Sequence, residues 1–427
     1  MTREKADTDL VDSIEAFLKP IILSLEPEDV TGPGRPRILP ALALWAGMLV
    51  CVARGFSAQL ELWRILSYSG LWDFPRYALS DDAIYRRLKH EERNTFQVIF
   101  EKVTQMLRAR IGSERAGIGN LASFATGIYA LDEMTLDAIT KRLPSLRQIP
   151  GTVLAGKVTT LFDLRAQIWH HLAFQENATQ NEKVAARSML AHMAPGSLLL
   201  ADMGYFSFPW FDELTRGGYY WISRVRALTS YTVVHTLFKR DGVLDAIVHL
   251  GAYRADMAAN AVRLVSFQRN GKTWSYMTNV LDPRMLSLRE IGLLYARRWD
   301  IEMMFNMVKT HLKLHILWSS HINVVVHQIF AVFTVAQIIL GIRAEIATKA
   351  DADVFEVSLD LMIRWLPRLA HEGLDPIQTT VERGRQAKII RPSTRIKHDI
   401  PDPPLADYDP LPDGISLTRK PRYAGKP

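Results

Sequence analysis

The sequence contains a single cysteine, Cys51, so it forms no internal disulfide and no zinc site built from paired cysteines. A chain this poor in cysteine suits a reducing cytosol. Three familiar signatures are also missing, namely the Walker phosphate-binding loop, His-Glu-x-x-His and Gly-x-Ser-x-Gly. Catalysis by a Ser/His/Asp triad therefore has no supporting motif.

Long uninterrupted hydrophobic runs are missing as well, and a membrane-spanning helix needs about 18 clean apolar residues. The run Ile38–Ala53 is short and contains Pro40, and the run Ile322–Ile342 is interrupted by polar residues such as Gln328 and Gln337. We expect both runs to form buried core helices of a soluble protein. The polar first ten residues do not read as a signal peptide.

Positive charge exceeds negative charge, with 52 Lys and Arg against 45 Asp and Glu and a net charge of +7. Lys and Arg neutralise phosphates and release counterions, so the excess favours a polyanionic partner. Simple solubility explains the same excess equally well. Hydrophobic residues make up 48% of the 427 residues, enough for two or three domains with sizeable cores.

The first 118 residues show apolar spacing near 3.6, which predicts a helical N-terminal domain. Ser80 is a suitable N-cap for a helix that carries Arg86 and Arg87. A short helix and a loop before it would make a helix-turn-helix-like reader of DNA. The alternative is an ordinary amphipathic helix with a basic face. The expected helices are Asp9–Leu18, Pro40–Arg54, Ala58–Ser67 and Ser80–Arg110.

From about residue 127 the pattern changes to strands that alternate with helices, which predicts an α/β core over residues 119–345. Two expected strands, Gly127–Asp132 and Leu198–Asp202, end on carboxylates. A segment rich in Val and Thr at about 225–272 predicts a β-rich insertion. A long helix is expected from Ser287, where Ser-Leu-Arg-Glu has the capping-box pattern.

The C-terminal part divides into a helical region at 346–381 and a basic, proline-rich tail at 382–427. Prolines at 401, 403, 404, 410 and 412 are incompatible with regular structure. We therefore expect this tail to be disordered or extended.

One helical face after residue 290 carries an unusual set of polar side chains. At about 100° per residue, Tyr295, Arg298, Glu302 and Lys309 fall within an arc of about 60°. The opposite arc is mostly apolar. A solvated face with intrahelical ion pairs is the simpler explanation. One acid among several cations, however, suits a metal ligand that lies beside phosphate-binding groups.

These residues spell Tyr-x2-Arg-x3-Glu-x6-Lys, which resembles the signature of insertion-element-4-type DDE transposases. That family has two upstream aspartates at strand ends. Leu-Asp-Glu-Met-Thr offers Asp132 for the first, and Asp-Met-Gly-Tyr offers Asp202 for the second. Neighbouring acids compete with them: Glu133 and Asp137 lie close to Asp132. We expect Asp163 to be structural or to support the site, and Asp212 and Asp300 to be solvated.

The resemblance implies a ribonuclease-H-like catalytic core with a β-rich insertion. Asp132, Asp202 and Glu302 would bind two Mg²⁺ or Mn²⁺ ions, because carboxylates select hard cations. Tyr295, Arg298 and Lys309 would grip DNA phosphates. Trp299 would stack on a base, or else be a buried aromatic.

The implied activity is excision and insertion of a bacterial-type insertion sequence. The partners would be double-stranded DNA, both terminal inverted repeats and target, with a homodimer in the synaptic complex. The protein would be cytoplasmic and associated with the nucleoid. Two alternatives stay open: a ribonuclease-H-like nuclease without strand transfer, and an inactive DNA-binding derivative.

Overall fold

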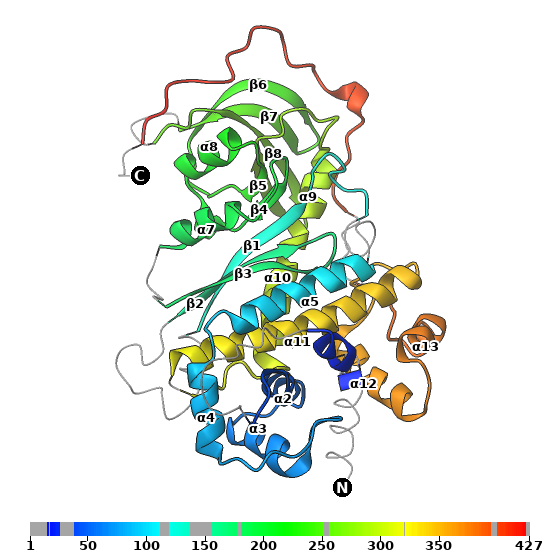
Figure 1. Ribbon diagram of the computed structural model, residues 1–427. Coiled ribbons are helices and arrows are strands. Elements are labelled where there is room, and N and C mark those ends of the chain that lie inside the picture. The colour runs from blue at the N-terminus through cyan, green and yellow to red at the C-terminus, as the bar shows by residue number, and fades with distance from the viewer. Residues whose placement is uncertain are drawn as a thin grey trace.

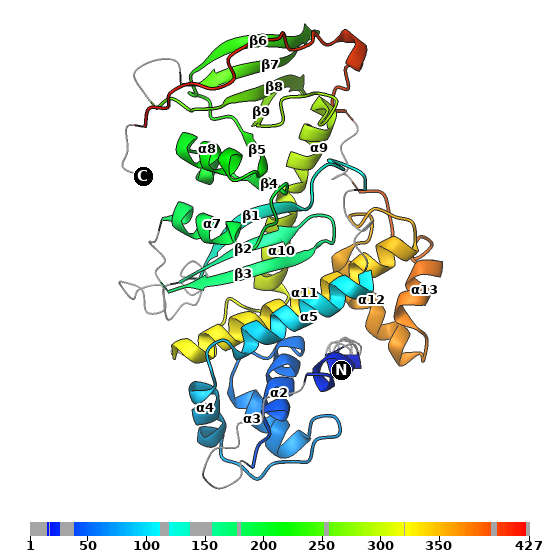
Figure 2. The same ribbon diagram turned by 45° about the horizontal axis from the view of Figure 1, so that its top comes forward.

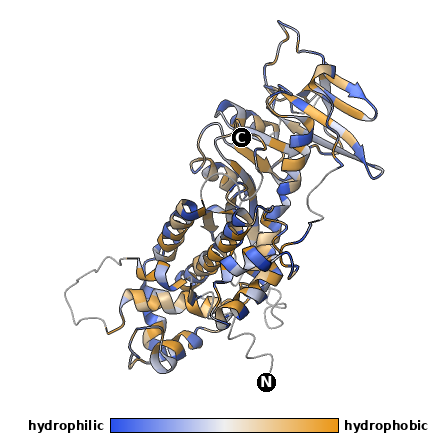
Figure 3. Ribbon diagram, turned by 90° about the vertical axis from the view of Figure 1, so that its right-hand side faces the viewer, coloured by the Kyte–Doolittle hydropathy of each residue, from blue (hydrophilic) through white to orange (hydrophobic). Residues whose placement is uncertain are grey.

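The computed structural model describes residues 15–16, 18–25, 38–111, 119–136, 156–176, 181–251, 256–319, 321–393 and 399–423. A large sheet fills one half of the elongated molecule and a group of helices fills the other (Figure 1). Both halves carry long hydrophobic stretches on their helices and strands (Figure 3). Most of the helix expected at Asp9–Leu18 lies outside the described residues.

The described residues before β1 are helical, as expected for the first 118 residues. The single helix predicted over Ser80–Arg110 is two helices, because Glu91 adopts an extended backbone after the first of them. Ser80 caps that first helix by accepting a hydrogen bond from the amide of Ala83. The elements are α2 (Ala41–Ala53), α3 (Leu60–Arg64), a π-helical turn (Ile65–Ser69), α4 (Asp81–His90) and α5 (Thr95–Ile111).

Helix α11 (Ile322–Lys349) runs through the centre of the molecule and packs against α2, α4 and α5. It is long and apolar enough to cross a membrane, yet its apolar window is wholly buried inside the protein. Its polar residues have internal partners. The Gln337 side chain accepts from the Trp169 amide and donates to the Trp169 carbonyl and to the Thr104 hydroxyl. The expected core helix is therefore confirmed.

The described strands form one nine-stranded mixed sheet in the order β3-β2-β1-β4-β5-β9-β8-β7-β6. Strands β1, β4 and β5 are parallel, and the remaining neighbours are antiparallel. The mixed α/β class is confirmed, and the β-rich insertion extends the core sheet through β9. The strands are β1 (Ile128–Thr135), β2 (Lys157–Asp163), β3 (Ile168–Gln175), β4 (Leu198–Ala201), β5 (Tyr220–Arg224), β6 (Tyr231–Arg240), β7 (Val243–Leu250), β8 (Ala261–Arg269) and β9 (Lys272–Thr278).

Alternation along the strands gives the core sheet two buried faces. On β4, Leu198 and Leu200 join the main core, whereas Leu199 and Ala201 join a second core under α7 and α8. The main core is continuous from the N-terminal helices to the C-terminal ones. The remaining helices are α7 (Glu182–Leu190), α8 (Phe208–Arg216), α9 (Leu288–Arg297), α10 (Trp299–Thr310), α12 (Leu359–His371) and α13 (Pro376–Arg383).

The proline-rich tail is extended and docked over residues 399–423, so disorder is the wrong description of this part. It runs along the insertion (Figure 2), where the Asp409 amide donates to the Leu237 carbonyl of β6. Near its end, the Tyr423 hydroxyl donates to Asp212 on α8. Asp212 was expected to be solvated, but it is 2% exposed and also accepts from the amides of Ala259 and Asn260.

Candidate active site

Two aspartates occupy matching positions on neighbouring parallel strands. The pairing of β1 with β4 ends at Leu131 opposite Ala201, so Asp132 and Asp202 are the next residues on each chain. Both point to the sheet face that carries the main core, because they are two residues beyond Ala130 and Leu200. Strand β1 does not end at Asp132 as expected, since it continues to Thr135 against β2.

The third acid is on a helix that crosses this face. The capping box at Ser287 and Glu290 is confirmed, but the long helix predicted from there is two helices, α9 and α10, that meet at Arg298. Glu302 lies in the first turn of α10, and Ile301 beside it is fully buried in the main core. Packing of the apolar side of α10 on β1 therefore sets the position of Glu302.

The three acids converge on one guanidinium group, that of Arg298. Its Nη2 donates to Glu302 Oε1 at 2.7 Å and lies 3.8 Å from Asp202 Oδ1, and its Nη1 lies 4.0 Å from Asp132 Oδ2. The Arg298 side chain is 6% exposed, whereas the side chains of Asp202 and Glu302 are 42% and 34% exposed. The carboxylates thus face solvent around a buried cation.

Burial affects the protonation of Asp132. Loss of solvent raises the pKa of Asp132 to about 6, against the opposing effects of the Glu133 amide and of Arg298. The nearby carboxylates Glu302 and Asp202 push the pKa of Asp132 in the same direction as burial. The pKa of Arg298 is raised despite its burial, because Asp202, Tyr295 and Glu302 surround it. The site therefore stabilises positive charge.

The donor set fits hard divalent cations, since it offers carboxylate oxygens and no thiol or imidazole. Within the described residues, no three His, Cys, Asp or Glu side chains are gathered closely enough to hold a metal ion. Each of the three acids instead lies within 4.0 Å of the Arg298 guanidinium. The chemistry of these side chains fits Mg²⁺ or Mn²⁺.

The predicted phosphate-binding residues differ in exposure. Tyr295 is 6% exposed, its ring packs on Tyr276, and its phenol forms a hydrogen bond with the backbone of Arg224. Burial raises the pKa of Tyr295 to about 12. Lys309 is half-buried near the end of α10. Trp299 is 56% exposed, so its alternative description as a buried aromatic is wrong.

The basic residues of α4 are engaged in ion pairs along their own helix. Arg86 pairs with Asp82 at 2.9 Å and stays exposed, whereas Arg87 pairs with Glu91 at 3.2 Å and is mostly buried. Glu91 also accepts a hydrogen bond from the Trp45 indole. The Arg86 side chain is therefore accessible to a partner. Arg87 instead connects the end of α4, through Glu91, to Trp45 on α2.

Of the two competing acids near Asp132, Asp137 lies outside the described residues and Glu133 faces away from the cluster. Glu133 alternates to the other side of β1 and forms a buried ion pair with Lys157 at 2.6 Å. Asp300, expected to be solvated, is fully buried and accepts from the Gln167 amide group.

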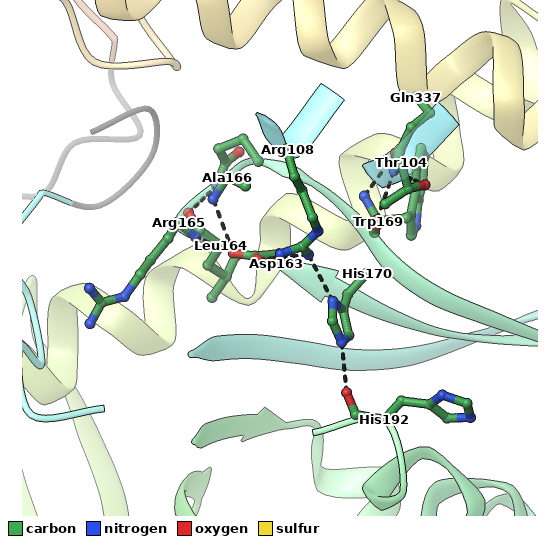
Figure 4. A network of polar contacts seen from close by, with 11 residues as sticks. Thr104, Arg108, Asp163, Leu164, Arg165, Ala166, Trp169, His170, His192 and Gln337 are labelled. Carbon is green, nitrogen blue, oxygen red and sulfur yellow. Dashed lines mark hydrogen bonds and ion pairs between the residues drawn. The ribbon is translucent and has the colours of Figure 1, made fainter. Parts of the chain in front are cut away.

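Asp163 has a structural environment, as expected. It pairs with Arg108 of α5 at 2.9 Å and accepts from the amides of Arg165 and Ala166 in the turn between β2 and β3. Arg108 also contacts His170, which in turn meets the His192 carbonyl (Figure 4). This network joins α5 to the sheet and lies apart from the three acids.

Sequence reasoning missed Arg224 at the same edge of the sheet. The pairing of β4 with β5 ends at Ala201 opposite Ser223, so Arg224 follows beside Asp202. Its guanidinium lies 5.1 Å from the centre of the Trp274 ring. The sequence signal for Arg224 was a basic residue at the end of a third buried strand. On that strand it takes the position that the two aspartates take relative to β1 and β4.

Residues 147–338 match the family model described as "Transposase DDE domain". The matched span includes Asp202 and Glu302 and begins after Asp132. A relative from Sinorhizobium fredii (strain NBRC 101917 / NGR234), named "Putative transposase y4zB", is 26% identical over 159 residues. That match covers 35% of this chain and 44% of the relative, so it spans less than half of the relative's length. In these regions the chain is therefore similar to a transposase DDE domain and to a putative transposase.

Two solved structures are among the matches to this chain. A piggyBac transposase synaptic complex with hairpin DNA matches with a TM-score of 0.40 and 11% identity, over 92% of this chain and 84% of that one. Endonuclease V from Streptomyces avermitilis matches with a TM-score of 0.21 and 12% identity, over 48% of this chain and 93% of that one.

Proposed function

We propose that this chain is a metal-dependent DNA transposase whose ribonuclease-H-like core uses Asp132, Asp202 and Glu302. The observation that carries the proposal is the convergence of these acids, from two parallel strands and one helix, around Arg298. The DDE domain match over residues 147–338 supports the same assignment. The insertion-element-4 type follows from the Tyr-x2-Arg-x3-Glu-x6-Lys spelling.

The three carboxylates would hold two Mg²⁺ or Mn²⁺ ions. Bound there, the ions supply activation of an attacking water or 3′-hydroxyl and stabilisation of the leaving oxygen. The strands β1 and β4 fix the backbone of the two aspartates, and the packing of α10 fixes that of Glu302. The reaction proceeds without a covalent protein intermediate.

The surrounding residues take different parts in binding DNA. Arg298 and Lys309 would contact phosphates beside the reacting bond, and the exposed Trp299 ring offers a surface for base stacking. Buried Tyr295 would instead position the backbone of Arg224.

The N-terminal helices are proposed to read the terminal inverted repeats. On α4, Arg86 is accessible, and Arg87 would have to leave Glu91 to take part. The assembly acting on both ends would be a homodimer in a synaptic complex, and it would work at the nucleoid.

A cleavage and joining assay tests this function. The substrate is the DNA that flanks the coding region, with its terminal repeats, in Mg²⁺. We expect Asp132→Asn, Asp202→Asn and Glu302→Gln each to lower cleavage by at least about a thousandfold. Glu133→Gln is the matched control, since Glu133 faces Lys157 on the other side of β1.

The alternatives give different outcomes in the same assay. Pre-cleaved ends that fail to join to target DNA would indicate a nuclease without strand transfer. End binding without any Mg²⁺-dependent cleavage would indicate an inactive DNA-binding derivative. Unchanged cleavage by Glu302→Gln would overturn the proposed site.

A further inference from the structure

Arg298 is a buried cation with few hydrogen bonds for its position. Nη2 donates to Glu302, while Nε and Nη1 are buried without a hydrogen-bond partner among the described residues. Asp132 and Asp202 lie within 4.0 Å of the group, which is ion-pair distance. A guanidinium is always charged, so its charge holds it among these acids.

The position of the guanidinium matters for the proposed metal ions. Mg²⁺ binds carboxylate oxygens at about 2.0–2.1 Å, with near-octahedral geometry. Glu302 Oε1 already has Nη2 at 2.7 Å, and the same guanidinium lies within 4.0 Å of both aspartates. An ion that is shared by these three acids therefore needs the space that the guanidinium fills.

The guanidinium that lies among the acids also lies next to an exposed aromatic ring. The centre of the Arg298 guanidinium lies 5.4 Å from the centre of the Trp299 ring, and that ring is 56% exposed. A cation over an indole face is stabilised electrostatically. A guanidinium that leaves the acids would therefore keep a stabilising contact with the Trp299 ring at the solvent boundary.

We propose that Arg298 is a resident counter-cation, which holds the three carboxylates together in the metal-free protein and is displaced by divalent ions. This inference rests on the proposed function. It adds that metal binding is a cation exchange, in which Arg298 lowers the metal affinity of the free protein. The displaced guanidinium is then available to a DNA phosphate, so metal and DNA each favour binding of the other.

Mn²⁺ affinity without DNA, measured from the paramagnetic signal of free Mn²⁺, tests the exchange. We expect Arg298→Gln to bind Mn²⁺ at least about tenfold more tightly than the wild type, because the competing charge is gone. We also expect its metal-free form to unfold at a lower temperature, and Mn²⁺ to restore that loss. Arg297→Gln is the matched control, since Arg297 pairs with Asp353, and its Mn²⁺ affinity should equal that of the wild type.

The outcomes separate the inference from the proposed function. If wild type and Arg298→Gln bind Mn²⁺ equally, or the variant binds it more weakly, the exchange is wrong and the metal site stands. If neither binds Mn²⁺, the proposed function fails and the exchange fails with it. If Arg298→Gln does not fold even in excess Mn²⁺, Arg298→Met decides, because it also removes the charge and keeps an apolar stem: tighter binding than wild type supports the exchange, and equal or weaker binding overturns it.

Discussion

Replacement of either member of the buried ion pair between Arg263 and Asp245 should strongly destabilise the insertion. Arg263 Nε and Nη2 donate to the two oxygens of Asp245 at 2.8 and 2.6 Å, and Nη1 donates to the Leu286 carbonyl at 2.6 Å. Both side chains are 0% exposed. The hydroxyl of Tyr408, from the docked tail, also bonds to the pair.

The magnitude follows from the complete burial of both charges. Arg263→Met leaves a carboxylate without compensation, and Asp245→Val leaves a guanidinium with the Leu286 carbonyl and Tyr408 only. We expect each variant to lose about 3–5 kcal/mol of unfolding free energy. The double variant has no buried charge, so it should cost no more than the worse single variant. The coupling energy is then about 3 kcal/mol or more.

Urea unfolding followed by tryptophan fluorescence measures the four free energies of this cycle. The exposed pair Arg284–Asp282 provides a control, because its side chains are 77% and 52% exposed. The same substitutions there should give a coupling energy of at most about 0.5 kcal/mol. A coupling energy this small at Arg263 and Asp245 would refute the reasoning.

Two further predictions concern the tail and the acid cluster. Tyr423→Phe removes one hydrogen bond to buried Asp212. This loss should lower the unfolding free energy by about 1.5–3 kcal/mol and speed proteolysis of the tail. An unchanged proteolysis rate would contradict the docked position. The folded protein holds a proton on Asp132 up to pH about 6, against an ordinary pKa of 3.8. The metal-free unfolding free energy should therefore fall by up to about 3 kcal/mol between these values as pH rises. Asp132→Asn should abolish this decrease in unfolding free energy. If the unfolding free energies of the variant and the wild type change in parallel with pH, the pKa of Asp132 is not raised.

Features set by short stretches of sequence were predictable. The capping box at Ser287 needs only four residues, and the N-cap at Ser80 needs one side chain and a nearby amide. The core strands were predictable because their residues are apolar on both faces. The end of β4 was predictable because a charged residue, Asp202, directly follows Ala201. Local signals of this kind also located the Tyr-x2-Arg-x3-Glu-x6-Lys segment.

Features set by distant partners were not predictable in the same way. Asp212 and Asp300 appear solvated in sequence, and both are buried because amides far along the chain donate to them. The break between α9 and α10 occurs at Arg298, which tertiary contacts with two strands hold in place. The docking of the tail depends likewise on Tyr423 reaching α8.

A change of metal preference tests the central claim, that the acids are metal ligands, most directly. Asp202→Cys replaces a hard oxygen ligand with a softer thiolate, which Mg²⁺ binds poorly and Mn²⁺ accepts better. The other cysteine, Cys51, is fully buried, so it should not interfere. The account predicts that DNA cleavage by Asp202→Cys is lost in Mg²⁺ and regained in Mn²⁺, while Glu133→Cys cleaves in both. Cleavage by Asp202→Cys at the wild-type rate in Mg²⁺ would contradict it.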